Sequence, residues 1–309
     1  MHRRDAIKSA VLAAGALGSG AAAARAAETR PAPIRARYCL NTSTIRGQKL
    51  SLVEEIDLAA KTGYDGIEPW MREIDEYVDN GGSLDDLRKR IADSGLTVES
   101  AIGFAAWIVD DDEKRRQGLE SAKRDMERVR SLGGARIAAP PVGATNEAVD
   151  LAAAAERYAK LLEVGRAAGV TPMLELWGFS KSLSRMGEVA HVAIESGQPD
   201  AAMLFDVYHI YKGGSDFNGL KVLSGKAIAA FHFNDYPADP PRATIGDADC
   251  VYCGDGVAPL TQIIRDLYAS GFNGPMSLEL FNRTYWQQDA AQVVKTGLEK
   301  MKAAVAAAG

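Results

Sequence analysis

Residues 169–176 read GVTPMLEL, and residues 197–207 read GQPDAAMLFDV. Each stretch opens with a glycine of the kind that ends a helix and then runs into a short apolar strand. The same order of helix, glycine and strand returns roughly every 30 to 40 residues, which is about the length of one βα unit. This repeat predicts a parallel sheet whose strands alternate with helices along the chain.

Eight β-rich runs fit this pattern, at residues 38–42, 66–69, 97–102, 136–139, 172–176, 202–207, 228–233 and 276–280. Apolar residues at helical spacing lie between them, as in the segment 260–267. Eight such units without a linker predict a single α/β domain, a (β/α)₈ TIM barrel over residues 37–309. The alternative is a doubly wound open sheet, which a glycine-rich phosphate loop after the first strand would favour. Residues 41–47, NTSTIRG, are not such a loop.

The N-terminus has features of an export signal. Arg3 and Arg4 precede a weakly apolar run rich in alanine and glycine, and Ala24-Arg25-Ala26 resembles a cleavage site between small residues. The run is too short and too poor in leucine and isoleucine for a stable membrane anchor. We therefore predict a twin-arginine signal peptide over residues 1–26, a linker over residues 27–36, and a periplasmic or secreted protein. A disordered alanine-rich tail is the alternative.

The composition excludes several classes of function. The 309 residues include 36 Lys or Arg and 41 Asp or Glu, so the net charge is −5 and no basic surface indicates nucleic-acid binding. Three cysteines are too few for a disulfide scaffold. Cys250 and Cys253 fall in one predicted loop, as a local disulfide or as two free thiols, and a structural zinc site would need a second pair. We expect a small-molecule partner, no nucleic acid and no membrane anchor, and the sequence is compatible with a homo-oligomer.

Four consecutive predicted strands end on a residue that can bind a metal. These residues are Glu175, Asp206, His232 and Glu279, and the active sites of TIM barrels lie at such carboxyl ends. Strand alternation turns the side chains of Met173 and Glu175 to the same face. A buried carboxylate or imidazole is costly unless it is paired or binds a metal. Three carboxylates and one imidazole therefore predict a site for one divalent ion, Mn²⁺, Mg²⁺, Co²⁺ or Zn²⁺.

Six short motifs follow one another along the chain. They are GYDGIE at residues 63–68, LELW at 174–177, FDVYH at 205–209, HFND at 232–235, GDG at 254–256 and SLE at 277–279. In this order they resemble the xylose isomerase-like TIM-barrel superfamily, and within it the sugar phosphate isomerase/epimerase group. The resemblance covers the chain from about Tyr38 to Val305, and it implies that the four strand-end residues are the metal ligands.

The resemblance also implies roles in catalysis. In the epimerases the two ligand glutamates exchange protons with the sugar, so Glu175 and Glu279 take the catalytic roles. A proton is removed next to a carbonyl, and a divalent cation chelating two substrate oxygens stabilises the resulting enediolate. The expected substrate contacts are Glu68, His209, Arg242 and Trp177, of which Trp177 would stack on a sugar ring. Arg242 lies ten residues after His232, a looser spacing than in the epimerases.

Two classes of enzyme stay open. The first is a sugar isomerase or epimerase that transfers a proton between two glutamates. The alternative is a metal-dependent lyase that dehydrates a keto-sugar or keto-cyclitol, like the inosose dehydratases, with His209 or a carboxylate protonating the leaving oxygen. A non-catalytic sugar-binding protein is disfavoured because pure binding does not require so many ionisable groups.

The residues present bear on two other groups of the superfamily, the apurinic endonucleases and the xylose isomerases proper. The apurinic endonucleases of the superfamily need three metals and more imidazoles than this chain offers, and His191 falls on a predicted helix away from the strand ends. Xylose isomerases proper bind two metals through extra carboxylates after the seventh strand. Asp247, Asp249 and Asp255 could supply these carboxylates, so a two-metal hydride shift stays open.

Overall fold

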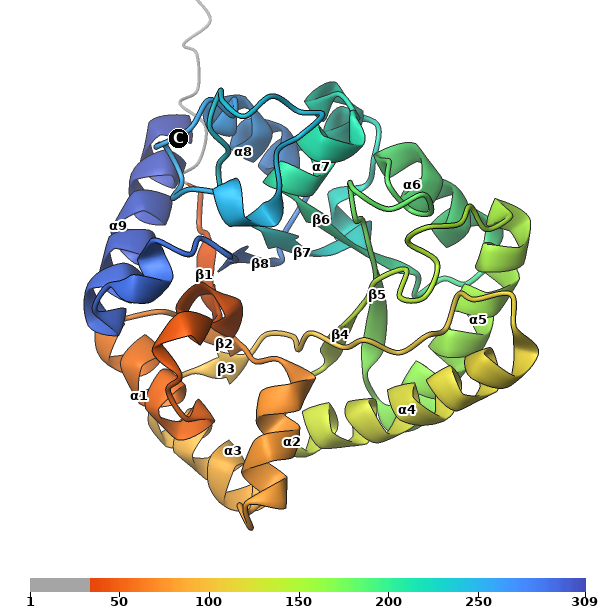
Figure 1. The fold of residues 1–309 in the computed structure, drawn as a ribbon, viewed down its shortest axis with the longest axis horizontal. Helices are drawn as coiled ribbons and strands as arrows, with labels where there is room; N and C mark the ends of the chain where they lie inside the picture. The colour runs from red at the N-terminus through yellow and green to blue at the C-terminus, as the bar shows by residue number, and fades with distance from the viewer. Residues whose placement is uncertain (1–33) are drawn as a thin grey trace, which may run out of the picture. The chain divides into compact units, whose positions relative to one another are not determined.

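The computed structural model describes residues 34–309, in which eight parallel strands form a curled sheet ringed by helices (Figure 1). The strands are β1 (Arg37–Asn41), β2 (Gly66–Glu68), β3 (Thr97–Val98), β4 (Arg136–Ala139), β5 (Thr171–Glu175), β6 (Ala202–Asp206), β7 (Ile228–His232) and β8 (Pro275–Leu278). Their order is β3-β2-β1-β8-β7-β6-β5-β4. The predicted TIM barrel is confirmed. The predicted signal peptide and residues 27–33 of the predicted linker lie outside the described residues.

The third strand is much shorter than its predicted span of residues 97–102. Regular pairing with β2 ends at Val98, and the chain then bonds alternately to its two neighbours. The amide of Ala101 donates to the carbonyl of Arg136, whereas the amide of Ile102 donates to that of Pro69. Isolated parallel bridges from Ile102 to Trp70 and to Ala138 join the two ends of the sheet. The barrel is therefore closed between β3 and β4 by an irregular seam and not by a continuous ladder.

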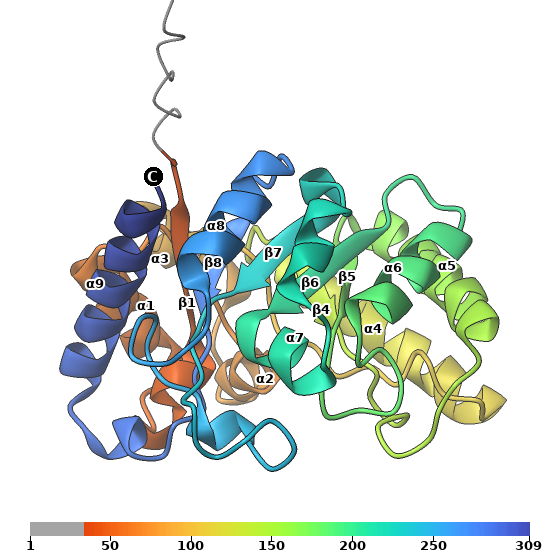
Figure 2. The same ribbon diagram turned by 90° about the horizontal axis from the view of Figure 1, so that it is seen from above.

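Nine α-helices within residues 34–309 surround the strands (Figures 1 and 2). They are α1 (Leu52–Thr62), α2 (Met71–Asp79), α3 (Leu84–Asp93), α4 (Asp112–Ser131), α5 (Leu151–Ala168), α6 (Met186–Glu195), α7 (Val207–Gly213), α8 (Leu260–Ala269) and α9 (Ala290–Ala308). Short 3₁₀ helices are η1 (Thr42–Gln48), η2 (Phe217–Lys221), η3 (Gly225–Ala227), η4 (Asp247–Asp249) and η5 (Tyr285–Gln287). Helix α9 packs against α1 and α8, so the last helix of the chain completes the outer ring beside the first.

Glycines end the helices where the repeat predicted them. Gly63 and Gly169 follow α1 and α5 with φ angles of 90° and 71°, a left-handed conformation that costs glycine little. Each glycine turns the chain directly toward the following strand. No helix in the described part of the chain is both long and apolar enough to cross a membrane.

The alternation of side chains along the strands separates two apolar cores. Leu174, Phe205 and Phe231 point outward and pack in the large core between the strands and the helices. Inward-facing residues form a smaller cluster that fills the barrel, consisting of Ile102, Ala138, Met173, Ala202, Leu204 and Ala230. The predicted inward direction of Met173 is thus confirmed. This packed interior supports the polar residues at the carboxyl ends of the strands.

Candidate metal centre and active site

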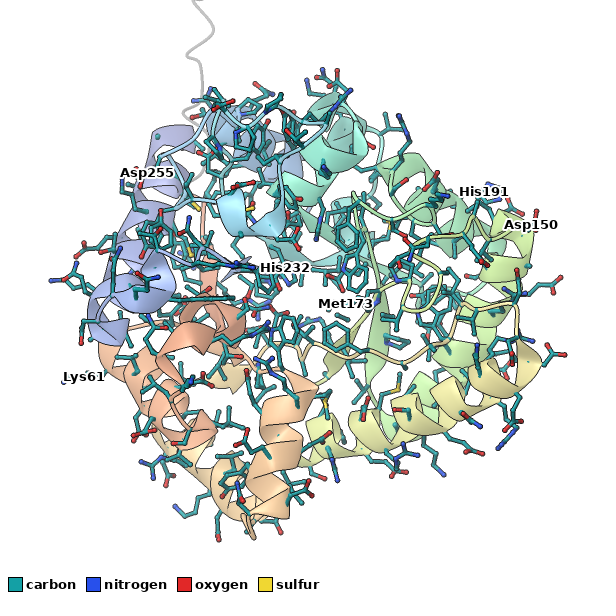
Figure 3. All side chains as sticks on the ribbon, viewed as in Figure 1. Lys61, Asp150, Met173, His191, His232 and Asp255 are labelled. Carbon is teal, nitrogen blue, oxygen red and sulfur yellow. The ribbon has the colours of Figure 1, made fainter. Side chains whose placement is uncertain are left out.

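The four predicted metal ligands lie together at one end of neighbouring strands. Glu175, Asp206 and His232 are the last residues of β5, β6 and β7, and Glu279 directly follows β8. Asp206 pairs in register with His232 across β6 and β7. None of the four is more than 5% exposed. Figure 3 shows His232 near the middle of the ring of strands.

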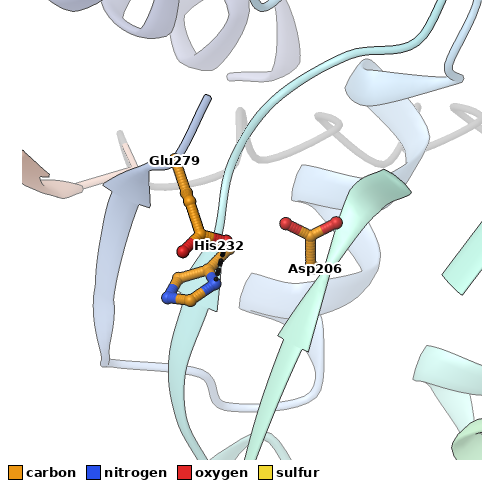
Figure 4. Close-up of side chains that lie close together, drawn as sticks. All are labelled: Asp206, His232 and Glu279. Atoms are coloured by element: carbon orange, nitrogen blue, oxygen red, sulfur yellow. Dashed lines mark ion pairs between the residues drawn. The ribbon is translucent and has the colours of Figure 1, made fainter. Parts of the chain in front are cut away.

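Three of these residues converge on a single point. Ligand atoms of Asp206, His232 and Glu279 all lie within 4.8 Å of one another (Figure 4). The Nδ1 atom of His232 is 2.9 Å from Oε2 of Glu279, but the two atoms are not aligned as a hydrogen bond. Two ligand atoms this close together can both bind one cation. The donor set of two carboxylates and one imidazole fits a divalent metal.

Glu175 stands outside this group of three but faces the same space. Its Oε1 atom accepts a hydrogen bond from Nε1 of Trp177 at 2.9 Å, and its Oε2 atom is buried without a partner in residues 34–309. Burial, together with the nearby carboxylate of Glu279, raises the pKa of Glu175 to about 8. A buried carboxylate oxygen without a hydrogen-bond donor is unfavourable when the group is charged, and a bound cation would offset that cost.

Glu68 is placed beneath His232. Its Oε2 atom lies 3.0 Å from Nε2 of His232, and both side chains are fully buried. Hydroxyls of Ser100 and Ser277 also donate to the Glu68 carboxylate. Burial opposes ionisation of Glu68, but these partners outweigh it and lower the pKa of its carboxyl to about 2. Glu68 was predicted to contact substrate; its oxygens are instead occupied by other side chains, and this placement suits the orientation of His232.

His232 is flanked by carboxylates on both ring nitrogens. Burial disfavours the imidazolium form, but Glu279 and Glu68 raise the pKa of His232 well above its usual value. Burial likewise raises the pKa of Asp206. The site thus holds more negative charge than its buried surroundings accommodate, and it favours a positive charge, whether a proton or a metal ion.

Two asparagines that were not predicted as site residues hold the carboxylates in place. The amide of Asn41, at the end of β1, donates to Glu68 at 2.9 Å and to Glu279 at 3.0 Å. The amide of Asn234 donates to Asp206 at 2.7 Å, and its oxygen accepts from the backbone of Tyr208. Asn41 ends β1, and Asn234 lies two residues after His232 at the end of β7; these positions at strand ends were the available signal in the sequence.

A cavity of about 190 Å³ opens above the metal centre. Its lining residues are Trp70, Ile102, Phe104, Glu175, Trp177, Phe179, His209, Asp247, Glu279 and Phe281. Aromatic rings form most of its wall, with Phe104 in contact with Trp70 and Trp177 at centroid distances of 4.9 and 6.3 Å. Such a wall offers flat apolar faces around a small polar centre, as ligand sites for ring-shaped molecules do.

His209 reaches the cavity from the start of α7. Its backbone amide donates to Oδ1 of Asp206 at 2.7 Å, so the predicted metal ligand Asp206 is also the N-cap residue of α7. Its Nδ1 atom is buried and has no hydrogen-bond partner within the described chain. The predicted substrate contacts His209 and Trp177 therefore both line the cavity.

Arg242 is not brought to the cavity. It is exposed, and its guanidinium lies beside Gly214. The Nζ atom of Lys212 donates to the backbone carbonyls of Arg242, Ala243 and Ile245, which fixes this loop against α7. The loop instead presents Asp247 to the cavity.

The carboxylates considered for a second metal are dispersed. Asp247 lines the cavity, whereas Asp249 accepts from the backbone of Gly246. Asp255 forms an ion pair with Lys300. Figure 3 shows Asp255 and His191 at the outer edge on opposite sides of the barrel, both away from His232. Cys250 and Cys253 are buried free thiols.

The GDG motif has a structural explanation in Asp235. The carboxylate of Asp235 accepts hydrogen bonds from the amides of Gly254, Gly256 and Ala258. A Cβ atom on Gly256 would lie 2.3 Å from Asp235, so only glycine fits there. The motif thereby anchors the long loop after β7 to Asp235, three residues beyond His232.

Comparisons with known proteins agree with this architecture. The inosose isomerase of Bacillus velezensis is 27% identical over 274 residues, covering 87% of this chain and 97% of that protein. The 3-dehydroshikimate dehydratase of Pseudomonas aeruginosa is 24% identical over 237 residues, covering 75% of this chain and 36% of that protein.

Solved structures share the fold. The crystal structure of IOLI protein with a bound zinc atom superposes with a TM-score of 0.82 at 23% identity, covering 87% of this chain and 98% of the other. An L-ribulose 3-epimerase structure gives a TM-score of 0.71 at 22% identity, covering 89% and 96%. The family model described as xylose isomerase-like TIM barrel matches residues 56–304. With that match, and with eight parallel strands whose ends carry the motifs of the resemblance, the chain belongs to the xylose isomerase-like TIM barrel family.

Proposed function

We propose that this protein is a divalent-metal-dependent isomerase or epimerase of a sugar or cyclitol, which moves a proton between Glu175 and Glu279. The observation that carries the proposal is that both carboxylates line one cavity from different strands. In the sheet, β5 and β8 are separated by β6 and β7, so the two carboxylates reach a substrate from different sides. The names of the relatives, an inosose isomerase and an L-ribulose 3-epimerase, support this class of substrate.

In the proposed reaction, one glutamate removes the proton from the carbon next to a carbonyl. The other returns a proton to the opposite face of that carbon or to its neighbour, so no atom is gained or lost. Glu175, Asp206, His232 and Glu279 would hold the metal, one Mn²⁺, Mg²⁺, Co²⁺ or Zn²⁺ ion. When bound, the metal supplies positive charge that stabilises the enediolate.

Elimination of water is the second candidate function. His209 lines the cavity, and its imidazole, whose Nδ1 atom has no hydrogen-bond partner in residues 34–309, is a candidate acid for a departing hydroxyl. One glutamate would take the α-proton, the carbon–oxygen bond would break, and the oxygen would leave as water with the proton from His209. The dehydratase named among the relatives supports this alternative.

The deciding experiment incubates the metal-loaded protein with ketoses and inososes in D₂O and follows each by NMR and mass spectrometry. The proposal expects an isomer of unchanged carbon skeleton with deuterium next to the carbonyl, whereas dehydration would lower the mass by one water. His232→Ala should lose the metal by elemental analysis, while the exposed control Glu195→Gln keeps it. An isomer formed without any deuterium would contradict the two-glutamate relay.

A further inference from the structure

A second, larger cavity adjoins the one above the metal centre. Its volume is about 450 Å³, against about 190 Å³ for the first. Phe104 lines both cavities and is 40% exposed, so its ring forms the boundary between them. In Figure 1 the segment that carries Phe104 runs from β3 past the end of β4 to the start of α4.

The wall of the second cavity is held firmly in place. Nε1 of the buried Trp107 donates to the carbonyl of Pro140 at 2.9 Å, and Arg157 donates to the carbonyl of Ile108. Gly118 lets α4 lie directly against this segment, because a Cβ atom there would be 2.5 Å from the carbonyl oxygen of Ala106. These contacts fix the backbone that lines the cavity.

The chemistry of the second cavity suits a neutral molecule with many hydroxyls. Lys114, Ser121 and Glu147 bring an ammonium, a hydroxyl and a carboxylate to its wall, and Val109 and Val149 provide apolar surface. Two further carboxylates of the wall already have partners: Asp110 forms an ion pair with Arg157, and Asp111 accepts from the amide of Lys114 at the start of α4. Donors and acceptors of both signs are present, without the cluster of cations that a phosphate would require. The face of Phe104 offers a platform on which a ring can pack.

The first cavity is small, and exposed aromatic rings border it. Its rim includes Phe104 and Phe179, and Phe179 is 46% exposed. A ring bound between Glu175 and Glu279 would occupy this cavity, and a substituent directed toward Phe104 would reach the second cavity. Exposed aromatic side chains at such a junction are costly in water unless a ligand covers them.

We propose that the second cavity is a binding subsite for a second ring unit joined to the reacting one, so that the preferred ligand is a glycoside or disaccharide-like conjugate. This inference rests on the proposed function, since it takes the first cavity as the place of the reacting ring. It goes further by assigning a chemical class to the part of the ligand that is not transformed.

The test compares glucose with the disaccharides cellobiose and maltose, by calorimetric titration of the metal-loaded protein. At least one disaccharide should bind about tenfold more tightly than glucose, which corresponds to about 1.4 kcal/mol. Saturation-transfer NMR should show contacts to protons of both rings. Equal affinities for glucose and both disaccharides, or contacts to one ring only, would overturn the proposal.

Two kinds of variant locate the effect. Ser121→Trp fills the second cavity from α4 and should remove the disaccharide preference without changing glucose affinity, whereas Arg124→Trp, exposed on the same helix, should leave both unchanged. The truncations Lys114→Ala and Glu147→Ala test the same subsite without adding bulk. A preference retained in all three cavity variants would contradict the subsite.

The Glu279→Gln variant separates this inference from the proposed function. It removes the proton relay but leaves the second cavity intact, so it should keep the disaccharide preference. If the wild-type protein converts no sugar while the preference persists, only the proposed reaction fails. If monosaccharides react with deuterium uptake while the preference is absent, only the subsite fails.

Discussion

Oε2 of Glu68 lies 3.0 Å from Nε2 of His232, and this buried contact joins β2 to β7 across the inside of the barrel. With Nε2 directed at Glu68, the other ring nitrogen, Nδ1, is left for the space shared by Asp206 and Glu279. A carboxylate that holds a metal-binding histidine in this way fixes the ring and increases its basicity.

The first prediction concerns this contact. Glu68→Gln keeps the size of the side chain but removes its charge, and it should weaken divalent-metal affinity roughly 10- to 100-fold, as expected for a group that orients a ligand. Competition with a coloured chelator measures the affinity. Glu76→Gln, exposed on α2, is the control and should not alter it. Unchanged affinity in Glu68→Gln would show that His232 needs no such support.

The second prediction separates metal binding from proton transfer. Glu279→Gln keeps an oxygen in the site but loses the base, so metal affinity should fall modestly. Turnover should fall by about 10²- to 10⁴-fold, the usual effect of losing general acid–base help. Metal content and single-turnover rates are measured on the same sample. Near-normal turnover with the metal bound would remove Glu279 from the mechanism.

The third prediction concerns stability and pH at Glu55. This side chain on α1 is 2% exposed, and its Oε2 atom has no partner within residues 34–309. Burial, with the nearby carboxylate of Glu73, raises the pKa of Glu55 to about 9. The folded state therefore binds this proton more tightly than the unfolded chain does, and the resulting stability is present at low pH and lost as pH rises toward 9.

Glu55→Gln removes that proton equilibrium. Relative to the wild type, the variant should gain free energy of unfolding between pH 5 and pH 8, as measured by urea denaturation at both values. Glu299→Gln, exposed on α9, serves as the matched control and should show no such gain. A difference between variant and wild type that is the same at both pH values would refute the prediction.

The fourth prediction concerns export. We propose that the precursor leaves the cytoplasm by the twin-arginine route, because Arg3 and Arg4 precede the alanine-rich run. Changing both to lysine should keep the precursor in the cytoplasm, and fractionation with N-terminal sequencing of the mature protein measures this. Export that continues undiminished, or a mature chain that still begins at Met1, would count against the signal.

The sequence predicted the strand ends well because the relevant information is local. At β5 to β8 the alternating apolar residues and the final ionisable residue fall within five or six positions. One short segment therefore predicts both the strand and the side chain that faces inward. The role of Glu68 could not be read this way. Its partner His232 is 164 residues away, and only closure of the barrel brings them together.

Two other differences have similar causes. Pairing in β3 stops at Val98 because the chain must bond to both β2 and β4 at the seam, a requirement that depends on the neighbours and not on the segment itself. Arg242 was assigned by its resemblance to an arginine that follows the histidine of the seventh strand in the epimerases, although its spacing is looser here. Its loop is instead held by the ammonium of Lys212, a contact that spacing does not encode.

The proposed metal ligands come from β5 to β8, whereas the second cavity is bounded by the segments after β3 and β4. The proposed reactive groups and the proposed subsite thus lie on different halves of the barrel. Insertions or substitutions in the connections leading to α4 and α5 can alter which molecules are accepted while the reactive groups on the other half stay untouched. Directed evolution restricted to residues 104–121 and 143–149 is the economical way to obtain new substrate ranges from this scaffold.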